Sequence, residues 1–145
     1  MFVVVLFNMS DIKIFYHTPF LLSDKQRTVS WLERVAFNEK RTLFSLEYNF
    51  VDKNEMIRIN TKHLGHNYLT DVLSFNYSQT DKIHGEVFVS VDAVRENALD
   101  LDEVFDTELH RVLLHGLLHL CGHNDKTEKE IRDIRLLENK YLSNL

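Results

Sequence analysis

Residues 106–125 read DTELHRVLLHGLLHLCGHND, and they contain the most apolar helix that the sequence predicts. We expect this helix from about Asp106 to Cys121, because its apolar residues recur at helical spacing: Val112, Leu113, Leu114, Leu117, Leu118 and Leu120. His115 and His119 are four residues apart, about 40° around the axis, so both imidazoles project from one face. Gly122 can end the helix in a left-handed conformation and turn the chain back.

This histidine pair predicts a divalent metal site, with zinc as the first choice. A helix supplies two ligands to one ion in the same way in the HExxH zinc enzymes. Two surface histidines would give the same spacing, but an uncompensated pair in so apolar a helix costs stability, and a metal removes that cost. The next side chains able to bind are His123 and Asp125. Three protein ligands with an open position are typical of catalytic zinc.

Gly116 argues against a metallopeptidase, because it occupies the place of the glutamate that acts as general base in HExxH enzymes. Glu108 lies two turns earlier on the same face and cannot easily replace that base. Cys121, the only cysteine, lies about 120° from His115 around the helix and is expected in the core. His110 lies about 140° from His115, and we expect it to be a surface or internally hydrogen-bonded histidine.

The rest of the chain mixes strands and helices, which predicts an α+β or mixed α/β fold in one domain, residues 1–145. Residues 2–7 and 12–17 are expected to form one or two strands, and 44–50, 71–77 and 85–91 one strand each. The further helices are 23–37, a short one after 52, 92–99 and one after 127. Three helix starts carry capping pairs: Ser23 with Gln26, Asp52 with Glu55, and Thr127 with Glu130. The last helix has an expected buried stripe of Ile131, Ile134, Leu137 and Tyr141.

Composition narrows the classes of protein further. The net charge of −5 argues against a protein that coats nucleic acid through broad electrostatics, although a local basic groove stays compatible with it. The single cysteine excludes an internal disulfide and fits a reducing compartment, so a cytoplasmic location is expected. The apolar run Met1–Phe7 lacks the basic flank and cleavage site of a signal peptide, and no run reaches the ~20 residues of a membrane span. Met9 is an alternative start.

Two motifs in this order resemble the signatures of the YbeY-type endoribonuclease family. Residues 115–122, HGLLHLCG, are similar to the HGxLHLxG signature, and residues 70–75 match the signature TDVLSF. Residues 85–90, GEVFVS, are similar to a third family strand. The resemblance extends over about Ile59–Tyr141. It implies a mixed sheet of four or slightly more strands flanked by helices, and one zinc ion held by three residues at the end of a central helix.

The resemblance implies that the first two ligands are His115 and His119, and that the third lies ten residues after the first. Asp125 stands there in place of the family histidine, and His123 occupies the family's usual tyrosine position. Carboxylate oxygen is an acceptable zinc ligand, so Asp125 is the first choice and His123 the alternative. A carboxylate lowers the charge of the site, which raises the pKa of water bound to the metal.

A second departure is Leu64, which stands where the family usually has an arginine. An arginine there would clamp the scissile phosphate, and the substitutes nearby are Lys62, His63 and His66. The resemblance also places the signature strand beside the metal. Thr70, Asp71 and Ser74 are therefore expected to bind substrate, and Asp71 either to orient a ligand imidazole or to accept a proton from metal-bound water.

The expected activity is zinc-dependent hydrolysis of single-stranded RNA in ribosomal RNA maturation and ribosome quality control. The expected partners are ribosomal RNA and the ribosome, with no DNA and no membrane. Two alternatives stay open. One is a non-catalytic, zinc-containing ribosome-assembly factor that binds RNA, and the other, disfavoured by Gly116, is a small metallopeptidase.

Overall fold

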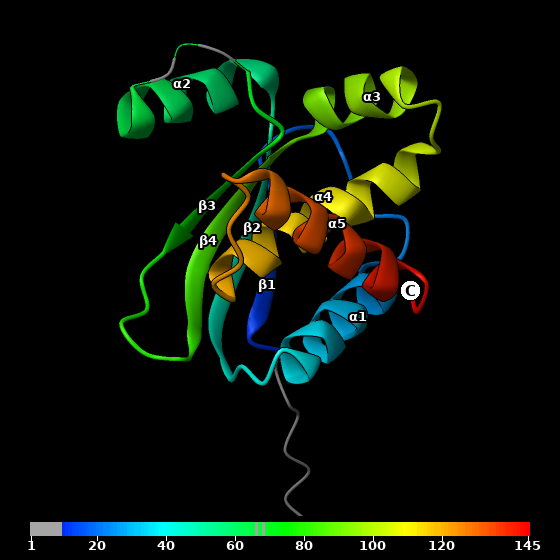
Figure 1. Ribbon diagram of the computed structural model, residues 1–145. Helices are drawn as coiled ribbons and strands as arrows, with labels where there is room; N and C mark the ends of the chain where they lie inside the picture. Colours follow the sequence, from blue (N-terminus) through cyan, green and yellow to red (C-terminus); the bar gives the residue numbers. More distant parts are fainter. Residues whose placement is uncertain (1–9, 66, 68) are drawn as a thin grey trace, which may run out of the picture.

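Helix α4, Phe105–Leu120, is the apolar helix expected near Asp106 to Cys121, and it packs against the sheet (Figure 1). The structure, a computed structural model, describes residues 10–65, 67 and 69–145. The other elements are β1 Ile12–Tyr16, α1 Lys25–Asn38, β2 Leu43–Val51, α2 Lys53–Leu64, β3 Val72–Asn76, β4 Ile83–Ser90, α3 Val91–Asp100 and α5 Glu128–Leu142. The β-rich segment 2–7 and the alternative start at Met9 lie outside the described residues.

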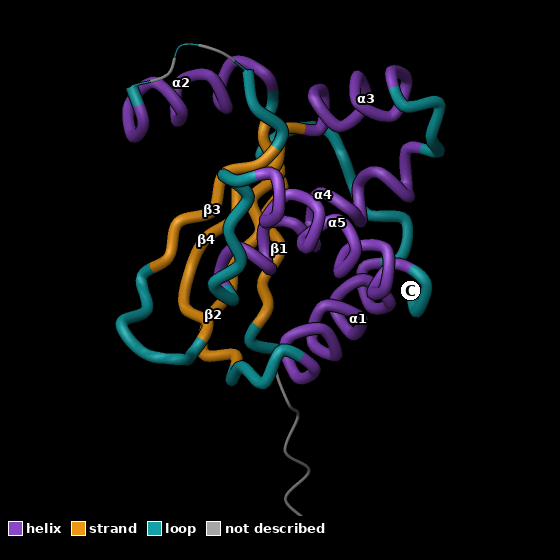
Figure 2. Tube along the Cα trace, in the orientation of Figure 1, coloured by secondary structure: helices purple, strands orange, loops and turns teal. Residues whose placement is uncertain are grey.

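The four strands form one mixed sheet in the order β1-β2-β4-β3. The neighbours β1, β2 and β4 are parallel, and β3 runs antiparallel to β4 at the edge. Figure 2 shows α1, α4 and α5 together on one side of the sheet, with α2 apart from them. The predicted α+β class with a mixed four-stranded sheet is therefore confirmed.

The core lies between the sheet and α4. It contains fully buried side chains from β2, β4 and α4: Leu46, Tyr48, Phe50, Val87, Val89, Leu113, Leu114, Leu117 and Leu118. Tyr48 donates a hydrogen bond from its hydroxyl to the Leu113 carbonyl at 2.8 Å, so its polar end is satisfied inside the core. Because α4 is buried along this face, its C-terminal end has a fixed position relative to β3 and β4.

Gly116 allows α4 to approach the sheet closely. A Cβ atom at this position would lie 2.7 Å from Val87 Cγ1 and 3.3 Å from Ser74 Oγ. At this short separation Ser74 donates a hydrogen bond to the Gly116 carbonyl at 3.0 Å. Gly116 occupies the position of the peptidase base, and it thus also allows α4 to pack closely on β3 and β4.

Most predicted helix starts are confirmed, but one is wrong by a residue. Asp52 and Thr127 cap α2 and α5 as expected. The cap of α1 is Asp24 rather than Ser23, because the Asp24 carboxylate accepts from the Arg27 amide at 3.1 Å. A carboxylate is favoured there, since it also meets the positive end of the helix dipole. Ser23 instead contacts Asp106 across the structure.

Two apolar positions differ from the buried patterns expected for them. Ile131 is 49% exposed, because the first turn of α5 overhangs a surface pocket instead of the core. Phe44 lies at the start of β2 and is 59% exposed, whereas the later alternating residues of that strand are buried. Among the described residues, no helix combines the length and apolar character that crossing a membrane requires.

Candidate metal centre

Three ligand atoms converge where α4 ends. The Nε2 atoms of His115 and His119 are 2.9 Å apart. Asp125 Oδ2 lies 3.2 Å from the first and 3.3 Å from the second. These are the three residues of the described chain whose ligand atoms cluster as a metal site requires. The structure therefore brings together both predicted histidines and the residue placed first as third ligand.

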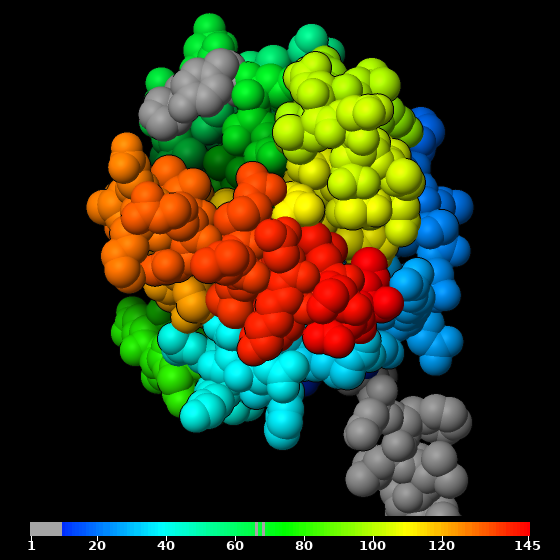
Figure 3. All heavy atoms as spheres, turned by 45° about the vertical axis from the view of Figure 1, so that its right-hand side comes forward, coloured from blue at the N-terminus to red at the C-terminus, as the bar shows by residue number. Residues whose placement is uncertain are grey.

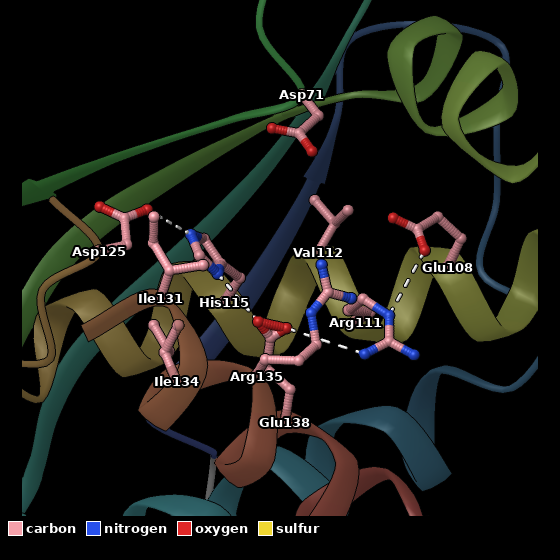
Figure 4. A pocket seen from close by; sticks show the side chains of 10 residues that line it. All are labelled: Asp71, Glu108, Arg111, Val112, His115, Asp125, Ile131, Ile134, Arg135 and Glu138. Carbon is pink, nitrogen blue, oxygen red and sulfur yellow. Dashed lines mark hydrogen bonds and ion pairs between the residues drawn. The ribbon is translucent and has the colours of Figure 1, made fainter. Parts of the chain in front are cut away.

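The loop after α4 turns Asp125 toward the histidines. Gly122 has φ +96°, a left-handed conformation that glycine adopts without steric cost. The amide of His123 donates to the Leu118 carbonyl at 3.0 Å, which closes the turn against the helix end. The chain then reverses, and the Asp125 carboxylate faces the histidine pair, as Figure 4 shows for His115.

Both imidazoles are held by their other ring nitrogen. Glu138 Oε1, from α5, lies 3.2 Å from His115 Nδ1, and Glu138 is buried. The carbonyl oxygen of His123 lies 2.9 Å from His119 Nδ1. Because both partners accept hydrogen bonds, each Nδ1 carries a proton, and in the neutral ring each Nε2 presents a lone pair. This is the tautomer that a metal-binding histidine needs.

Three acceptor groups facing one another need a positive charge between them. Zinc binds nitrogen and oxygen ligands at about 2.0–2.2 Å in a tetrahedron, whose edges are therefore about 3.3–3.6 Å long. The two separations from Asp125, 3.2 and 3.3 Å, lie close to these edges, and the 2.9 Å between the histidines is about 0.4 Å shorter. The donor set and its spacing thus fit a tetrahedral zinc ion with one position left for water or substrate.

Burial and the neighbouring carboxylates shift the pKa of His115 in opposite directions. Burial disfavours its protonated form, but the carboxylates of Glu138 and Asp125 favour it, and the pKa of His115 is raised above its usual value. In the metal-free protein a proton on this ring partly replaces the cation. Binding of a metal therefore competes with a proton at His115.

The imidazole of His123 is directed elsewhere. Its Nε2 contacts Glu39 Oε1 at the end of α1, while its backbone carbonyl accepts from His119. The side chain of the alternative third ligand is thus engaged outside the three-atom cluster.

Cys121 is buried, as expected for a core residue, and burial raises the pKa of its thiol to about 12. His110 is also buried, with Thr28 and the Asp106 carbonyl as hydrogen-bond partners.

A pocket of about 270 Å³ adjoins the cluster and includes His115 and Asp125 in its wall (Figure 4). Arg111 of α4 lies in it between two acids, 3.5 Å from Glu108 and 3.9 Å from Glu138. Burial raises the pKa of Glu108, and the nearby Asp71 carboxylate contributes to the rise. Arg135 of α5 is exposed to solvent and lines the same pocket.

The three residues expected to bind substrate have different positions. Asp71 lines the pocket, and its carboxylate accepts from Asn97 Nδ2 of α3 at 3.0 Å. Ser74 has its hydroxyl on the Gly116 carbonyl, so it joins β3 to α4. Thr70 is half-buried just before β3 and is not among the residues that line the pocket.

The neighbourhood of the missing family arginine lies away from the pocket lining. Leu64 ends α2 and is 48% exposed. Lys62 is exposed on the last turn of the same helix, and the His63 ring packs edge-on against Phe75 at 5.2 Å. The third substitute, His66, lies outside the described residues.

Sequence reasoning did not identify Glu138, Arg111 or Arg135 as site residues. The spacing of Glu138 places it on the buried stripe of the last helix, because it falls four residues after Ile134 and three before Tyr141. A charged residue on the buried stripe of a helix needs a polar partner. The identity of that partner depends on how α5 packs on α4, which the spacing along α5 does not reveal.

Comparison with known proteins connects this geometry to a family. The profile of the family described as Endoribonuclease YbeY matches residues 21–145. The Endoribonuclease YbeY of Flavobacterium psychrophilum is 38% identical over 127 residues, 88% of this chain and 91% of the relative. The Endoribonuclease YbeY of Phocaeicola vulgatus is 39% identical over 119 residues, 82% of this chain and 86% of the relative. The solution structure of a Thermotoga maritima protein superposes with a TM-score of 0.67 at 27% identity, covering 90% of this chain and 86% of that one.

Proposed function

The chain belongs to the endoribonuclease YbeY family, as its signatures predicted, and on this basis we propose that it is a zinc-dependent endoribonuclease that cleaves single-stranded RNA. Its proposed role is ribosomal RNA maturation and ribosome quality control, in association with the ribosome and hence in the cytoplasm. The observation that carries the proposal is the convergence of His115, His119 and Asp125 beside a pocket. Relatives named for the same activity support the choice of RNA as substrate.

We propose that His115, His119 and Asp125 hold one zinc ion. Zinc supplies Lewis acidity there, because it lowers the pKa of a water that it binds and polarises a phosphoryl oxygen. Glu138 and the His123 carbonyl keep both Nε2 atoms available to the metal. The Asp125 carboxylate leaves the site less positive than three histidines would.

The pocket residues suit the handling of a phosphodiester and of protons. Arg135 supplies an exposed guanidinium, which is suited to a phosphate group, in a position different from that of Leu64. Arg111 is already neutralised by Glu108 and Glu138, so its part is to keep these acids in place. The raised pKa of Glu108 and the proximity of Asp71 make these two carboxyl groups the candidates for accepting or donating a proton.

Cleavage of a fluorescent single-stranded RNA by the purified, zinc-loaded protein tests the proposal. We expect the native chain to cleave the RNA and Asp125→Ala to lose at least about 100-fold in rate, since the variant lacks one of three ligands. Asp133→Ala serves as the matched control, because Asp133 is an exposed carboxylate of α5 that pairs with the exposed Lys129. RNA left intact by the native protein, or equal cleavage by Asp125→Ala, would contradict the proposal.

A chelator melt separates the enzyme from the non-catalytic alternative. In a ribosome-assembly factor with structural zinc, removal of the metal unfolds the chain. The hydrophobic core packs residues of α1, α4 and α5 with those of the sheet, and the three ligands beside it are partly buried or exposed. We therefore expect the chelated protein to stay folded at 25 °C and to lose cleavage.

A further inference from the structure

A polar cluster joins the loop after α4 to the ends of α1 and α5. Glu39 follows the last residue of α1, and only 13% of its side chain is exposed. One carboxylate oxygen contacts His123 Nε2, and the other accepts a hydrogen bond from the Tyr141 hydroxyl at 2.5 Å. Arg41 Nη2 donates to the Cys121 carbonyl of the same loop at 2.8 Å. In Figure 3 the orange surface of the segment after α4 adjoins the cyan end of α1.

The position of Glu39 is costly for a helix. A carboxylate at the C-terminal end of a helix meets the negative end of the dipole, where a cation is favoured. Burial adds a desolvation cost, and among the described residues Glu39 forms an ion pair with His123. Neither local helix stability nor core packing accounts for an acid here, so its contact with His123 is the feature to explain.

Residue 123 is held at three points next to the metal ligands. Its amide donates to Leu118, its carbonyl accepts from His119 Nδ1 at 2.9 Å, and its side chain contacts Glu39. Asp125 follows two residues later. A shift of His123 would therefore move the acceptor that orients His119 and the segment that presents Asp125.

We infer that Glu39 is a positioning residue of the metal centre, acting through His123. It holds the imidazole of His123, and thereby the carbonyl that fixes the His119 tautomer and the direction of the loop toward Asp125. Tyr141 holds the second oxygen of Glu39, so the carboxylate keeps one orientation. The inference rests on the proposed function, since it requires a metal on His115, His119 and Asp125.

Cobalt binding tests this inference without relying on RNA cleavage. Cobalt(II) affinity is measured by competition with a chelator, and the visible cobalt spectrum reports the ligand geometry. We expect Glu39→Gln to weaken cobalt affinity about tenfold, as for other residues that orient metal ligands, and to alter the spectrum. Glu33→Gln is the matched control, because Glu33 is an exposed acid of the same helix that contacts Ser10. It should bind cobalt as the native chain does.

A double-mutant cycle tests whether Glu39 acts through His123. His123→Gln removes the imidazole and keeps the backbone carbonyl that accepts from His119. We expect the double variant to bind cobalt no more weakly than the single variant with the lower affinity, because both substitutions break the same Glu39–His123 contact. If Glu39→Gln does not fold, as judged by circular dichroism, Tyr141→Phe replaces it and is expected to weaken binding several-fold.

The possible failures are distinguishable. If the native chain binds no cobalt, the proposed metal site is overturned, and the inference that rests on it falls as well. If the native chain binds and Glu39→Gln matches it in affinity and spectrum, only the role of Glu39 is overturned. Additive losses in the double variant overturn the route through His123.

Discussion

Replacing Glu138 by glutamine separates the charge of this buried side chain from its shape. Its Oε1 lies 3.2 Å from His115 Nδ1, and its Oε2 lies 3.9 Å from Arg111. Glutamine keeps an oxygen that can accept from His115 but removes the negative charge that makes the ring a stronger ligand. Losses at such positions are typically 10–100-fold in metal affinity. Because the acceptor survives, we expect the lower end, about tenfold or ~1.4 kcal/mol.

Alanine at the same position removes the acceptor as well. His115 Nδ1 then loses its partner in a partly buried setting, and we expect a loss of zinc affinity of about 100-fold. The free energy of unfolding of the metal-free protein should also fall by about 2 kcal/mol, because buried polar groups are left without partners. Zinc affinity is measured by chelator competition, and stability by urea unfolding.

The control for this series is Glu128→Gln, an exposed acid at the start of the same helix. It should leave zinc affinity within twofold of the native value, since the exposed charge contacts no metal ligand. Native affinity in both Glu138 variants would refute the orienting role of this carboxylate and the tautomer assigned to His115.

Three further predictions follow from the same geometry. Asp125→His should retain zinc and move the pH–rate profile for RNA cleavage to lower pH by on the order of one unit, because a neutral third ligand leaves the site more positive; an unchanged profile would count against Asp125 as a ligand. Zinc affinity, measured by chelator competition, should fall as pH drops through the raised pKa of His115, because the proton competes with the metal. The metal-free protein should behave in the opposite way: the stability that the protonated ring contributes is full below about pH 6.5 and is lost as pH rises through the raised pKa. An affinity independent of pH would contradict this coupling. Gly116→Ala should lower the free energy of unfolding by about 1–2 kcal/mol in urea titrations, since its Cβ would lie 2.7 Å from Val87 Cγ1 and overpacking outweighs the better helix propensity of alanine; a more stable variant would show that the contact relaxes freely.

The features predicted from sequence are those that depend on residues near one another in the chain. The helical period placed His115 and His119 on one face, and the structure shows their Nε2 atoms 2.9 Å apart. Capping pairs located the starts of α2 and α5 for the same reason. The choice between His123 and Asp125 was undecided by spacing, because it depends on how the loop is held by Glu39 from another element.

The rest of the site required the packing of distant elements. Glu138 meets His115 across the α4–α5 contact, and Arg111 meets the same acid from α4. Tyr141 was expected as a buried stripe residue, and it is buried, yet its hydroxyl also holds Glu39, 102 residues away. A periodic pattern identifies which side chains turn inward, and the neighbour that each one meets is decided by tertiary structure.

A crystal of the protein soaked in zinc shows whether His115, His119 and Asp125 hold the metal, because anomalous scattering locates zinc independently of any activity. We expect one zinc ion per chain, bound at about 2.0–2.2 Å by Nε2 of His115, Nε2 of His119 and an oxygen of Asp125, with a fourth position open to solvent. Zinc bound through the His123 imidazole, or no zinc between these three side chains, would contradict it.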